Sequence, residues 1–588
     1  MYITLNDKRI EIKGEIAEKQ QAPWAAKIGS GTTEFGNFLP CDIKEWRDLR
    51  GGIGLESEEK PSNRLYWSEG VETSKEGYIV PGPYIETAGA LGAAPIKFAD
   101  YNGTGASLVY VIADDICSVW NPAGTPAWDD TDDGTALSDP TDMIVATDAT
   151  DTYLITCNGV SMRYTANGTA WGAHPSTQAI KYMAMFDKRL IGIDAGYKKL
   201  WYSPRENIDG TLASFNLSGD YSVVTKLFTG KLLTGLGEPT IYMQTDTGLF
   251  VIDFYTQTCY KMEVRYPATT NARAGMYWNS YLFIGTGSGI RRITPNLNSP
   301  WGPDQDDGLP ADFQGYIYDM LGTSHWVVAC VAGGTKDSIL KRHESLGGWH
   351  QVYSSTSAIE CIHWSPIYSP GRLWFGDGAA VKYIQFPDKT HDITKVSGYK
   401  YCAAGTLYLP RMSSVSIVPK VALKVEALTK DLVAANETLT PSYIVNDDIS
   451  MTGGDWTALG AFTVDPRPSS AFNSSLGISF YDIALKIVFA SGATDKAAKI
   501  KTIGLYYLTL PPAVSAWQFT VKALGDRAKE VITNLETARD STVLVNFSPD
   551  GDLNKSEKYV RIMSMPSKRW LDANAAEKVF NVVVTEVS

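Results

Sequence analysis

The chain has 588 residues, of which 44% are hydrophobic and 11% aromatic, and it carries a formal net charge of −12 with a pI of about 5.2. This length exceeds that of one average domain and leaves ample sequence for a hydrophobic core. The acidic balance and the lack of a run of basic residues argue against a protein that wraps nucleic acid by neutralising phosphates.

Residues 1–95 are predicted to form an extended segment with short strands. The segment opens with MYITLNDKRIEIKG, whose alternation around an Asp-Lys turn indicates a strand pair. This opening lacks the basic and apolar regions of a secretory signal, and no stretch of the sequence approaches the roughly 18 apolar residues that span a membrane. The rest of the segment is rich in Gly, Pro and charged residues. We expect it either to close the next domain or to reach a neighbouring subunit.

Residues 96–395 repeat one pattern seven times: an apolar strand, a tight Gly, Asp or Asn turn, and a second strand with aromatic or basic residues. Examples are SLVYVIADDICSVWN from Ser107, TYLITCNGVSMRYT from Thr152 and RLWFGDGAAVKYIQF from Arg372. Intervals of 39 to 51 residues separate the predicted unit starts, which are Ile96, Thr141, Ile180, Lys231, Ala272, Tyr316 and Ile359. That period is typical of a four-stranded propeller blade. Because the usual WD dipeptide with its upstream Gly-His is absent, the pattern predicts a degenerate β-propeller of about seven blades.

Residues 396–512 contain longer strands with period-two alternation. In YDIALKIVFASG, for example, apolar side chains fall on one face, namely Ile483, Leu485, Ile487 and Phe489. A sheet packed on one side produces this pattern. We therefore predict a β-sandwich of immunoglobulin-like or jelly-roll type.

Residues 513–588 follow a Leu-Pro-Pro break at Leu510 to Pro512 and predict a small α+β domain. A strand, WQFTVKAL, precedes a helix from Asp526 to Arg539, and three further strands follow. The helix carries an apolar stripe of Ala528, Val531, Ile532 and Leu535. The chain as a whole is predicted to be all-β, with this one long helix.

The seven cysteines are far apart in the sequence and odd in number; they are Cys41, Cys117, Cys157, Cys259, Cys330, Cys361 and Cys402. Several lie within apolar strands, so we predict buried free thiols in preference to a disulfide framework. Free thiols indicate that the protein folds in a cytoplasm.

Candidate metal ligands are few. His343 and His350 flank a Gly-Gly turn and could meet across a hairpin, but a surface turn is the favoured interpretation. Asp129, Asp133 and Gly134 fit part of a calcium loop, yet Pro140 stands where a bidentate Glu is required, so an EF-hand is excluded. The acidic turns at Asp304 and Asp550 are equally partial. We predict solvated turns and no cofactor, with a structural calcium ion as the alternative.

Catalytic motifs are absent from the sequence. The Gly-rich stretch from Gly285 has the wrong spacing for a phosphate loop and predicts a hairpin turn. No Walker sequence, G-x-S-x-G elbow or recognisable triad occurs. We therefore predict no catalytic residues and no enzyme, and keep a propeller hydrolase with paired carboxylates in the channel as an alternative.

Nine tryptophans recur in or beside the predicted blades: Trp120, Trp128, Trp171, Trp201, Trp278, Trp301, Trp349, Trp364 and Trp374. Packing between neighbouring sheets is the favoured role for these side chains. The alternative is contact with a glycan or a protein at the rim of the propeller.

The arrangement of the chain resembles that of tail-associated structural proteins of tailed bacteriophages. The resemblance lies in the lead-in GGIGLESEEKPSNRLYWSEGVET, the propeller, the strand GTLYLPR, the sandwich strings PSYIVNDD and DWTALGAFTV, and IKTIGLYYLTLPPAVSAWQFTVKA. Propeller-plus-sandwich chains are similar to the nozzle or tail-hub proteins that ring the DNA exit channel of short-tailed phages. The C-terminal unit is similar to modules in the tail tips of long-tailed phages.

The resemblance implies a virion structural protein of the tail, tail tip or neck, assembled in the host cytoplasm. Its implied partners are other tail or neck proteins and further copies of itself in a symmetric homo-oligomer. It implies no catalytic residues and no sequence-specific nucleic-acid binding. A tail protein that binds a host receptor or glycan is the alternative function, and the propeller hydrolase is the second.

Overall fold

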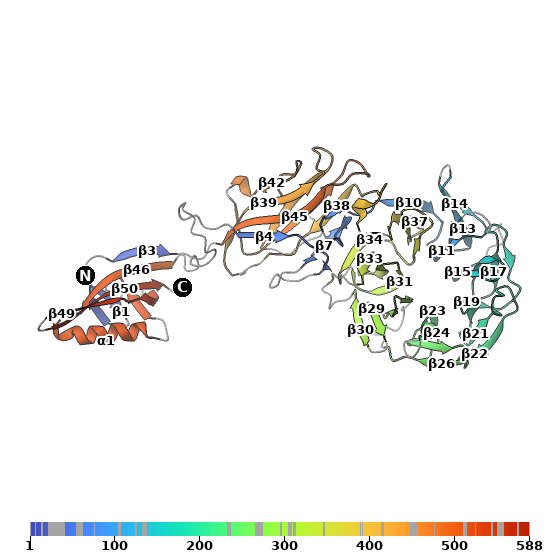
Figure 1. The fold of residues 1–588 in the computed structure, drawn as a ribbon, viewed down its shortest axis with the longest axis horizontal. Coiled ribbons are helices and arrows are strands. Elements are labelled where there is room, and N and C mark those ends of the chain that lie inside the picture. Colours follow the sequence, from blue (N-terminus) through green and yellow to red (C-terminus); the bar gives the residue numbers. More distant parts are fainter. Residues whose placement is uncertain are drawn as a thin grey trace.

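A computed structural model (Figure 1) describes most of the chain. The described residues are 2–5, 8–12, 16–21, 42–54, 63–75, 77–103, 107–123, 126–131, 138–231, 237–264, 274–287, 289–294, 297–303, 309, 313–344, 347–388, 390, 392–412, 417–446, 455–475, 477–509, 514–523, 525–541, 545–549, 558–572 and 575–586.

Seven antiparallel four-stranded sheets form a β-propeller (Figure 1). Blades 1 to 3 are β11 (Lys97–Tyr101), β12 (Leu108–Ala113), β13 (Ile116–Asn121) and β14 (Ala127–Asp130); β15 (Asp142–Thr147), β16 (Thr152–Cys157), β17 (Met162–Thr165) and β18 (Gly172–Ala173); and β19 (Ile180–Phe186), β20 (Arg189–Asp194), β21 (Lys199–Tyr202) and β22 (Ala213–Asn216). Blades 4 to 6 are β23 (Val224–Lys231), β24 (Pro239–Thr245), β25 (Leu249–Asp253) and β26 (Thr258–Lys261); β27 (Gly275–Trp278), β28 (Tyr281–Gly285), β29 (Ile290–Thr294) and β30 (Leu297–Gly302); and β31 (Tyr316–Gly322), β32 (Trp326–Ala332), β33 (Asp337–His343) and β34 (Trp349–Ser355).

The seventh blade combines strands from distant parts of the sequence and closes the ring. Its inner strands are β35 (Ile362–Ser365), β36 (Arg372–Asp377) and β37 (Ala380–Gln385), and its outer strand is β10 (Ile85–Ala90), which precedes blade 1 in the sequence. β10 pairs antiparallel with β37, so the last blade is fastened to the chain just before the first. Of the two roles expected for the lead-in, closure of the propeller is therefore the one that the structure confirms.

One predicted unit start was wrong, and another, Ala272, lies outside the described residues. The fourth unit was expected to begin at Lys231, but Lys231 is the last residue of the innermost strand β23, which begins at Val224. Polar residues hide this strand in the sequence, because Thr225 and Lys226 follow its first residue directly. A shift of pairing register between Val224 and Lys226 also breaks the simple alternation.

Two antiparallel sheets form the sandwich (Figure 1). One contains β41 (Thr457–Ala458), β40 (Thr438–Val445), β44 (Ile483–Ala490), β38 (Ala404–Tyr408) and β7 (Trp67–Glu69). The other contains β4 (Asp42–Trp46), β45 (Lys499–Thr509), β39 (Lys420–Lys430), β42 (Ser469–Ala471) and β43 (Ile478–Phe480). The predicted stripe of β44 is buried, with Ile483, Leu485, Ile487 and Phe489 each no more than 1% exposed.

The C-terminal domain is an eight-stranded sheet with one helix. Its strands are β1 (Tyr2–Leu5), β2 (Lys8–Glu11), β3 (Ala17–Gln21), β46 (Val514–Ala523), β47 (Val545–Ser548), β48 (Lys558–Ser564), β49 (Ser567–Asp572) and β50 (Ala575–Glu586). Helix α1 (Ala528–Arg539) confirms the predicted helix, and its residues Ala528, Leu535 and Ala538 are buried in the core of this domain. Within the described ranges, no helix is long and apolar enough to cross a membrane.

The N-terminal residues do not form a unit of their own, in contrast to the expected extended segment 1–95. They supply β1 to β3 to the C-terminal domain, β4 and β7 to the sandwich, and β10 to the propeller. Two short pairs lie between these strands, β5 (Gly52–Ile53) with β6 (Arg64–Leu65) and β8 (Val71–Glu72) with β9 (Val80–Pro81). The segment is divided in this way because β1, β3, β4, β7 and β10 each pair with a strand that lies hundreds of residues later in the chain.

The propeller and the sandwich share one hydrophobic core. A single cluster joins Phe283, Phe313 and Trp349 of the propeller side to Trp67 and Phe489 of the sandwich side. The rings of Trp67 and Phe313 lie 3.9 Å apart, centroid to centroid. Close backbone contact at this seam requires glycine, because a Cβ on Gly348 would collide with the carbonyl group of Gly51. The fold is thus an all-β chain of a seven-bladed propeller, a sandwich and a small α+β domain, as predicted.

Candidate functional site

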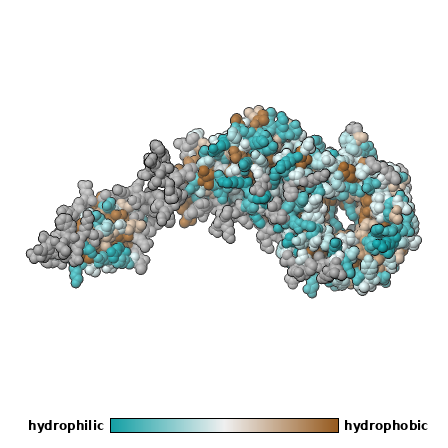
Figure 2. Space-filling model, in the orientation of Figure 1, coloured by the Kyte–Doolittle hydropathy of each residue, from teal (hydrophilic) through white to brown (hydrophobic). Residues whose placement is uncertain are grey.

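Charged side chains of the innermost strands surround the propeller channel. The first strands of neighbouring blades contact one another around the whole ring, and Figure 2 shows an opening through its middle. Lys97 of blade 1 pairs with Asp142 of blade 2. Lys226 of blade 4 reaches Asp319 of blade 6, with 2.9 Å between Nζ and Oδ1. These pairs therefore connect different blades.

A third pair closes the set at the seam between blades 7 and 1, where His363 Nε2 lies 2.9 Å from Asp100 Oδ1. Two of the three carboxylates also accept backbone N–H groups from the next blade. Asp142 Oδ2 accepts from Met183 N at 2.7 Å, and Asp319 Oδ2 accepts from Ile362 N at 3.3 Å. Because these contacts join residues of different blades, the arrangement ties the blades together.

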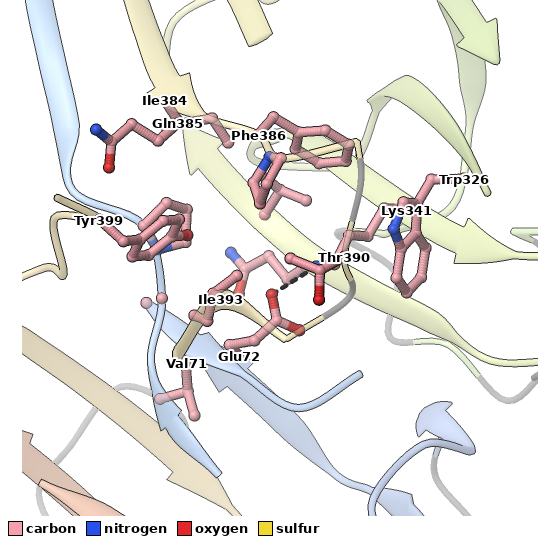
Figure 3. Close-up of a pocket in the computed structure, with 16 residues that line it drawn as sticks. Val71, Glu72, Trp326, Lys341, Ile384, Gln385, Phe386, Thr390, Ile393 and Tyr399 are labelled. Atoms are coloured by element: carbon pink, nitrogen blue, oxygen red, sulfur yellow. Dashed lines mark hydrogen bonds and ion pairs between the residues drawn. The ribbon is translucent and has the colours of Figure 1, made fainter. Parts of the chain in front are cut away.

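A second polar cluster lies where the β8–β9 loop enters the propeller (Figure 3). Glu72 of β8 and Lys341 of β33 form an ion pair with 2.5 Å between Oε2 and Nζ, and both side chains are less than 10% exposed. Ser74 donates to Glu72 through its backbone N–H at 2.9 Å and through its hydroxyl. Burial by itself would raise the pKa of Glu72. The charge of Lys341 and the hydrogen bonds from Lys341 and Ser74 outweigh the effect of burial and lower the pKa of Glu72 to about 2.

His350 of β34 belongs to the same buried region. Its Nδ1 lies 2.9 Å from the Thr73 hydroxyl, and its Nε2 lies 3.3 Å from the Arg50 carbonyl oxygen. Burial lowers the pKa of His350 to about 4, so the ring is neutral at pH 7. The cavity beside Glu72 and Lys341 measures 20 Å³, which is room for about one water molecule. This cluster fastens the loop to the propeller and leaves no space for an organic ligand.

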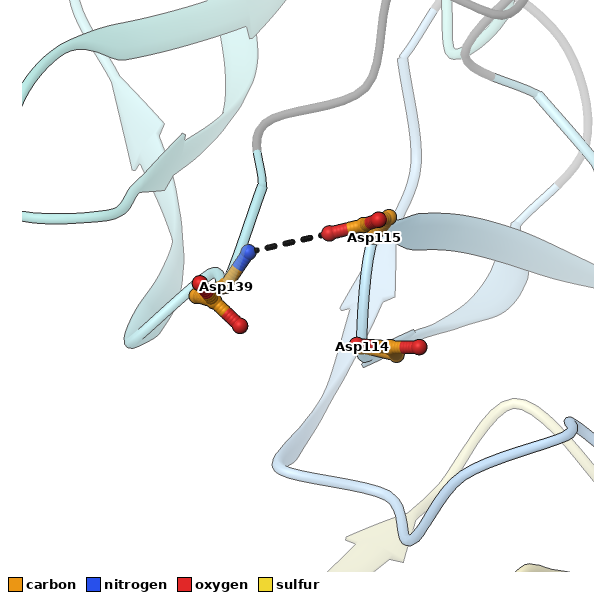
Figure 4. A group of neighbouring side chains, drawn as sticks. All are labelled: Asp114, Asp115 and Asp139. Carbon is orange, nitrogen blue, oxygen red and sulfur yellow. Dashed lines mark hydrogen bonds between the residues drawn. The ribbon is translucent and has the colours of Figure 1, made fainter.

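Three exposed carboxylates could hold a cation (Figure 4). Asp114 and Asp115 form the turn between β12 and β13, and Asp139 precedes β15. One oxygen of each lies within 4.8 Å of the others, and Asp139 N donates to Asp115 Oδ1 at 3.1 Å. Calcium requires six to eight oxygen ligands, so water would have to supply the remainder. The group was not predicted from the sequence, because Asp139 lies 24 positions from Asp115 and no metal-ligand spacing connects them.

The histidines considered as metal ligands have separate surroundings in the described part of the chain. His343 stacks on His325, with 6.1 Å between ring centroids, whereas His350 is buried at the seam. The expected surface turn is therefore wrong for His350. Asp129 lies on β14 and accepts from Asn121 Nδ2 at 2.8 Å. Asp133, Gly134, Asp304 and Asp550 lie outside the described residues. Gly285 ends β28 of the β28–β29 hairpin, as predicted.

All nine tryptophans pack in hydrophobic clusters, which confirms the favoured interpretation. The tightest group joins blade 7 to blade 1: the rings of Trp120, Trp128 and Trp374 lie 5.3 to 5.6 Å apart, centroid to centroid. The described cysteines are all free, and four of the six are buried. Burial raises the pKa of Cys157, Cys330 and Cys361 well above the ordinary value for a thiol.

Comparisons with known proteins give matches among solved structures alone. No family model and no curated protein matches the chain. Among solved structures, the chain is similar to the extracellular domain of the one-component system BT4673 from B. thetaiotaomicron, with 9% sequence identity and a TM-score of 0.38 over 74% of this chain and 64% of that one. It is also similar to PorZ, a bacterial surface component of the type-IX secretion system of Porphyromonas gingivalis, with 9% identity and a TM-score of 0.35 over 58% and 44%. The chain thus spans less than two thirds of either protein.

Proposed function

We propose that this chain is a structural protein of a tailed phage virion, located in the tail, tail tip or neck, where it acts as a rigid assembly scaffold. The observation that carries the proposal is the core shared by the propeller and the sandwich. Burial of large side chains such as Trp67, Phe313 and Trp349 across the seam holds the two domains in one fixed orientation. Two domains in one fixed orientation suit a scaffold subunit that holds its neighbouring proteins in place and carries mechanical load between them.

The C-terminal domain supplies the second half of the proposed role. It has its own hydrophobic core, separate from that of the sandwich, and β1 to β3 and β46 to β50 build it from both sides of the chain. We propose that this domain docks on neighbouring subunits or on other tail proteins while the propeller and sandwich keep their shape. Copies related by rotational symmetry around the tail axis would then form a closed ring.

Cryo-electron microscopy of the particles that contain this protein tests the proposal. We expect density for the propeller and the sandwich in a closed ring on the tail axis. Density at a flexible, peripheral tip would overturn the scaffold role and favour the receptor- or glycan-binding alternative. Absence of the protein from purified particles would overturn any virion role.

Substitutions at the seam connect the proposed role to the observation that carries it. Trp67→Ala removes a ring that is 4% exposed from the shared core, whereas Trp201→Ala changes a half-buried ring in blade 3, away from the seam. We expect particles complemented with the Trp67 variant to lack intact tails, and those with the Trp201 variant to assemble. Equal assembly with both variants would contradict a requirement for the rigid seam.

A further inference from the structure

Arg372 lies between two tyrosine rings at the edge of blade 7. The centre of its guanidinium group is 3.9 Å from the ring centroid of Tyr368 and 4.2 Å from that of Tyr383. Arg372 begins β36, Tyr383 lies on the paired strand β37, and Tyr368 precedes β36 in the β35–β36 connection. Cation–π attraction to both rings therefore restrains the guanidinium group on the β36–β37 hairpin.

The guanidinium edge has no partner within the described part of the chain. Arg372 contacts aromatic rings, but no hydrogen-bond acceptor or carboxylate of the described residues reaches its nitrogens. The residue is half-buried, and its nitrogens stay in contact with solvent. Because a guanidinium carries five N–H donors in one plane, the stack presents an oriented and unused set of donors to solvent.

Each of the two carboxylates near this stack lies within ion-pair distance of another basic residue. Asp100, which acts electrostatically on Tyr368, lies 2.9 Å from His363. Glu86, which acts on Tyr383, lies 2.6 Å from Lys400. Each acid thus has another basic residue nearby, and neither lies within ion-pair distance of Arg372. Among the described residues, Arg372 therefore has cation–π contacts but no ion-pair partner.

A buried aromatic group adjoins the stack. Trp374, two residues along β36 on the same face as Arg372, is fully buried, and its ring lies 5.8 Å from the guanidinium. The indole N–H groups of Trp374, Trp120 and Trp128 are buried without a hydrogen-bond acceptor. These nitrogens are buried, so of these groups only the Arg372 guanidinium can meet a ligand from solvent.

We propose that Arg372 binds a carboxylate, and that this carboxylate belongs to an Asp or Glu side chain of a partner protein. A carboxylate matches the planar fork of a guanidinium through two parallel N–H···O bonds. An acidic sugar would also need an open aromatic face for its ring. Tyr383, however, is covered by Arg372 and by Trp374, whose ring lies 4.7 Å away. This site stands independently of the proposed virion role, which bears only on which protein supplies the carboxylate.

Titration of the full chain with a blocked tri-aspartate peptide tests the site, and the tri-asparagine peptide is the control. The ionic strength is held constant, because salt screens surface charges. Tryptophan fluorescence is the readout, since Trp374 adjoins the site. We expect saturable binding of the aspartate peptide by the native protein. Arg372→Lys should bind at least about tenfold more weakly, because lysine keeps the charge but loses the fork. Arg372→Gln should show no saturable binding.

Arg205→Gln is the matched control variant, because Arg205 already pairs with Asp187 at 3.2 Å. Its affinity for the peptide should equal that of the native protein. Equal binding by the native protein and both Arg372 variants, or no saturable response at all, would overturn the site. Saturation with glucuronate and not with the peptide would overturn the protein partner. The lysine variant keeps the test valid if the glutamine variant fails to fold.

Discussion

Removal of Lys341 is expected to destabilise the seam between the propeller and the β8–β9 loop strongly. In the native protein, the pKa of Glu72 falls from 4.5 to about 2, which corresponds to about 3 kcal/mol of stabilisation of its charged form at 1.36 kcal/mol per pKa unit. In Lys341→Met, Glu72 is buried without a cation. Loss of one partner from a buried pair costs about 3 to 5 kcal/mol. We therefore expect the free energy of unfolding at pH 7 to fall by that amount.

The sign of the pH dependence should also reverse. In the native protein, the folded pKa of Glu72 is below its unfolded value, so its stabilisation is present above about pH 4.5 and is lost as the pH falls toward 2. In Lys341→Met, burial raises the pKa of Glu72 above its unfolded value. Folding then requires proton uptake, and the destabilisation grows as the pH rises above 4.5. The deficit relative to the native protein should therefore be larger at pH 7 than at pH 4.

Urea unfolding followed by tryptophan fluorescence measures both effects, because the Trp326 ring lies 4.7 Å from the Lys341 ammonium group. Lys424→Met is the matched control: Lys424 pairs with Glu426 at 2.6 Å but is 39% exposed, so its loss should cost less than about 1 kcal/mol. Glu72→Met combined with Lys341→Met should recover most of the loss, since no unpaired charge remains. A loss below 1 kcal/mol in Lys341→Met, or a double variant as unstable as the single one, would refute this reasoning.

Three further predictions concern other features. Burial lowers the pKa of His350 to about 4, below its unfolded value of 6.5, so the free energy of unfolding should fall by about 3 kcal/mol as the pH drops from 6.5 to 4. In urea unfolding, the free energy of His350→Gln should depend less on pH over this range, and an unchanged dependence would contradict the pKa of His350. Ala90 and Ala380 face each other across β10 and β37, so cysteines at these two positions should form a disulfide that closes a loop of about 290 residues. The disulfide should stabilise the fold by about 5 kcal/mol, seen as a higher melting temperature that a reductant reverses. Failure to form it would place the strands in another register. Cys157, Cys330 and Cys361 should resist a thiol reagent until the protein is denatured, as mass spectrometry of labelled peptides would show, and rapid labelling of the folded protein would contradict their burial.

Local signals explain which parts of the fold were predictable from the sequence. The hairpins of all seven blades were recognised because turns such as Asn158–Gly159 determine pairing between strands a few residues apart. Gly159 adopts a φ of +82°, which favours glycine. The helix from Ala528 was recognised by its apolar stripe. In both cases the decisive residues lie within about 15 positions of each other.

Long-range contacts explain what the sequence did not reveal. Glu72 pairs with Lys341 across 269 positions, and neither residue stands in a motif. β10 pairs with β37 only because the ring closes there. The stack of Arg372 with Tyr368 and Tyr383 involves residues that are close in the sequence. In the sequence alone, however, Arg372 is an ordinary basic residue at the start of a strand. No acidic residue among the described ones contacts Arg372, and this is visible only in the three-dimensional structure.

The distribution of the N-terminal strands sets the order in which the domains can be completed during synthesis. The first strands belong to the C-terminal domain, later ones to the sandwich, and β10 to the propeller, while the second half of the chain supplies the same three domains in reverse order. The strands of the propeller therefore lie between those of the sandwich, and the strands of the sandwich lie between those of the C-terminal domain. The propeller can consequently fold first. β1 pairs with β47, which is made about 540 residues later, a delay of roughly half a minute to two minutes at 5 to 20 residues per second. Throughout that interval the nascent strands β1 and β2 lack their sheet, which makes the beginning of the chain the part that most needs protection from aggregation.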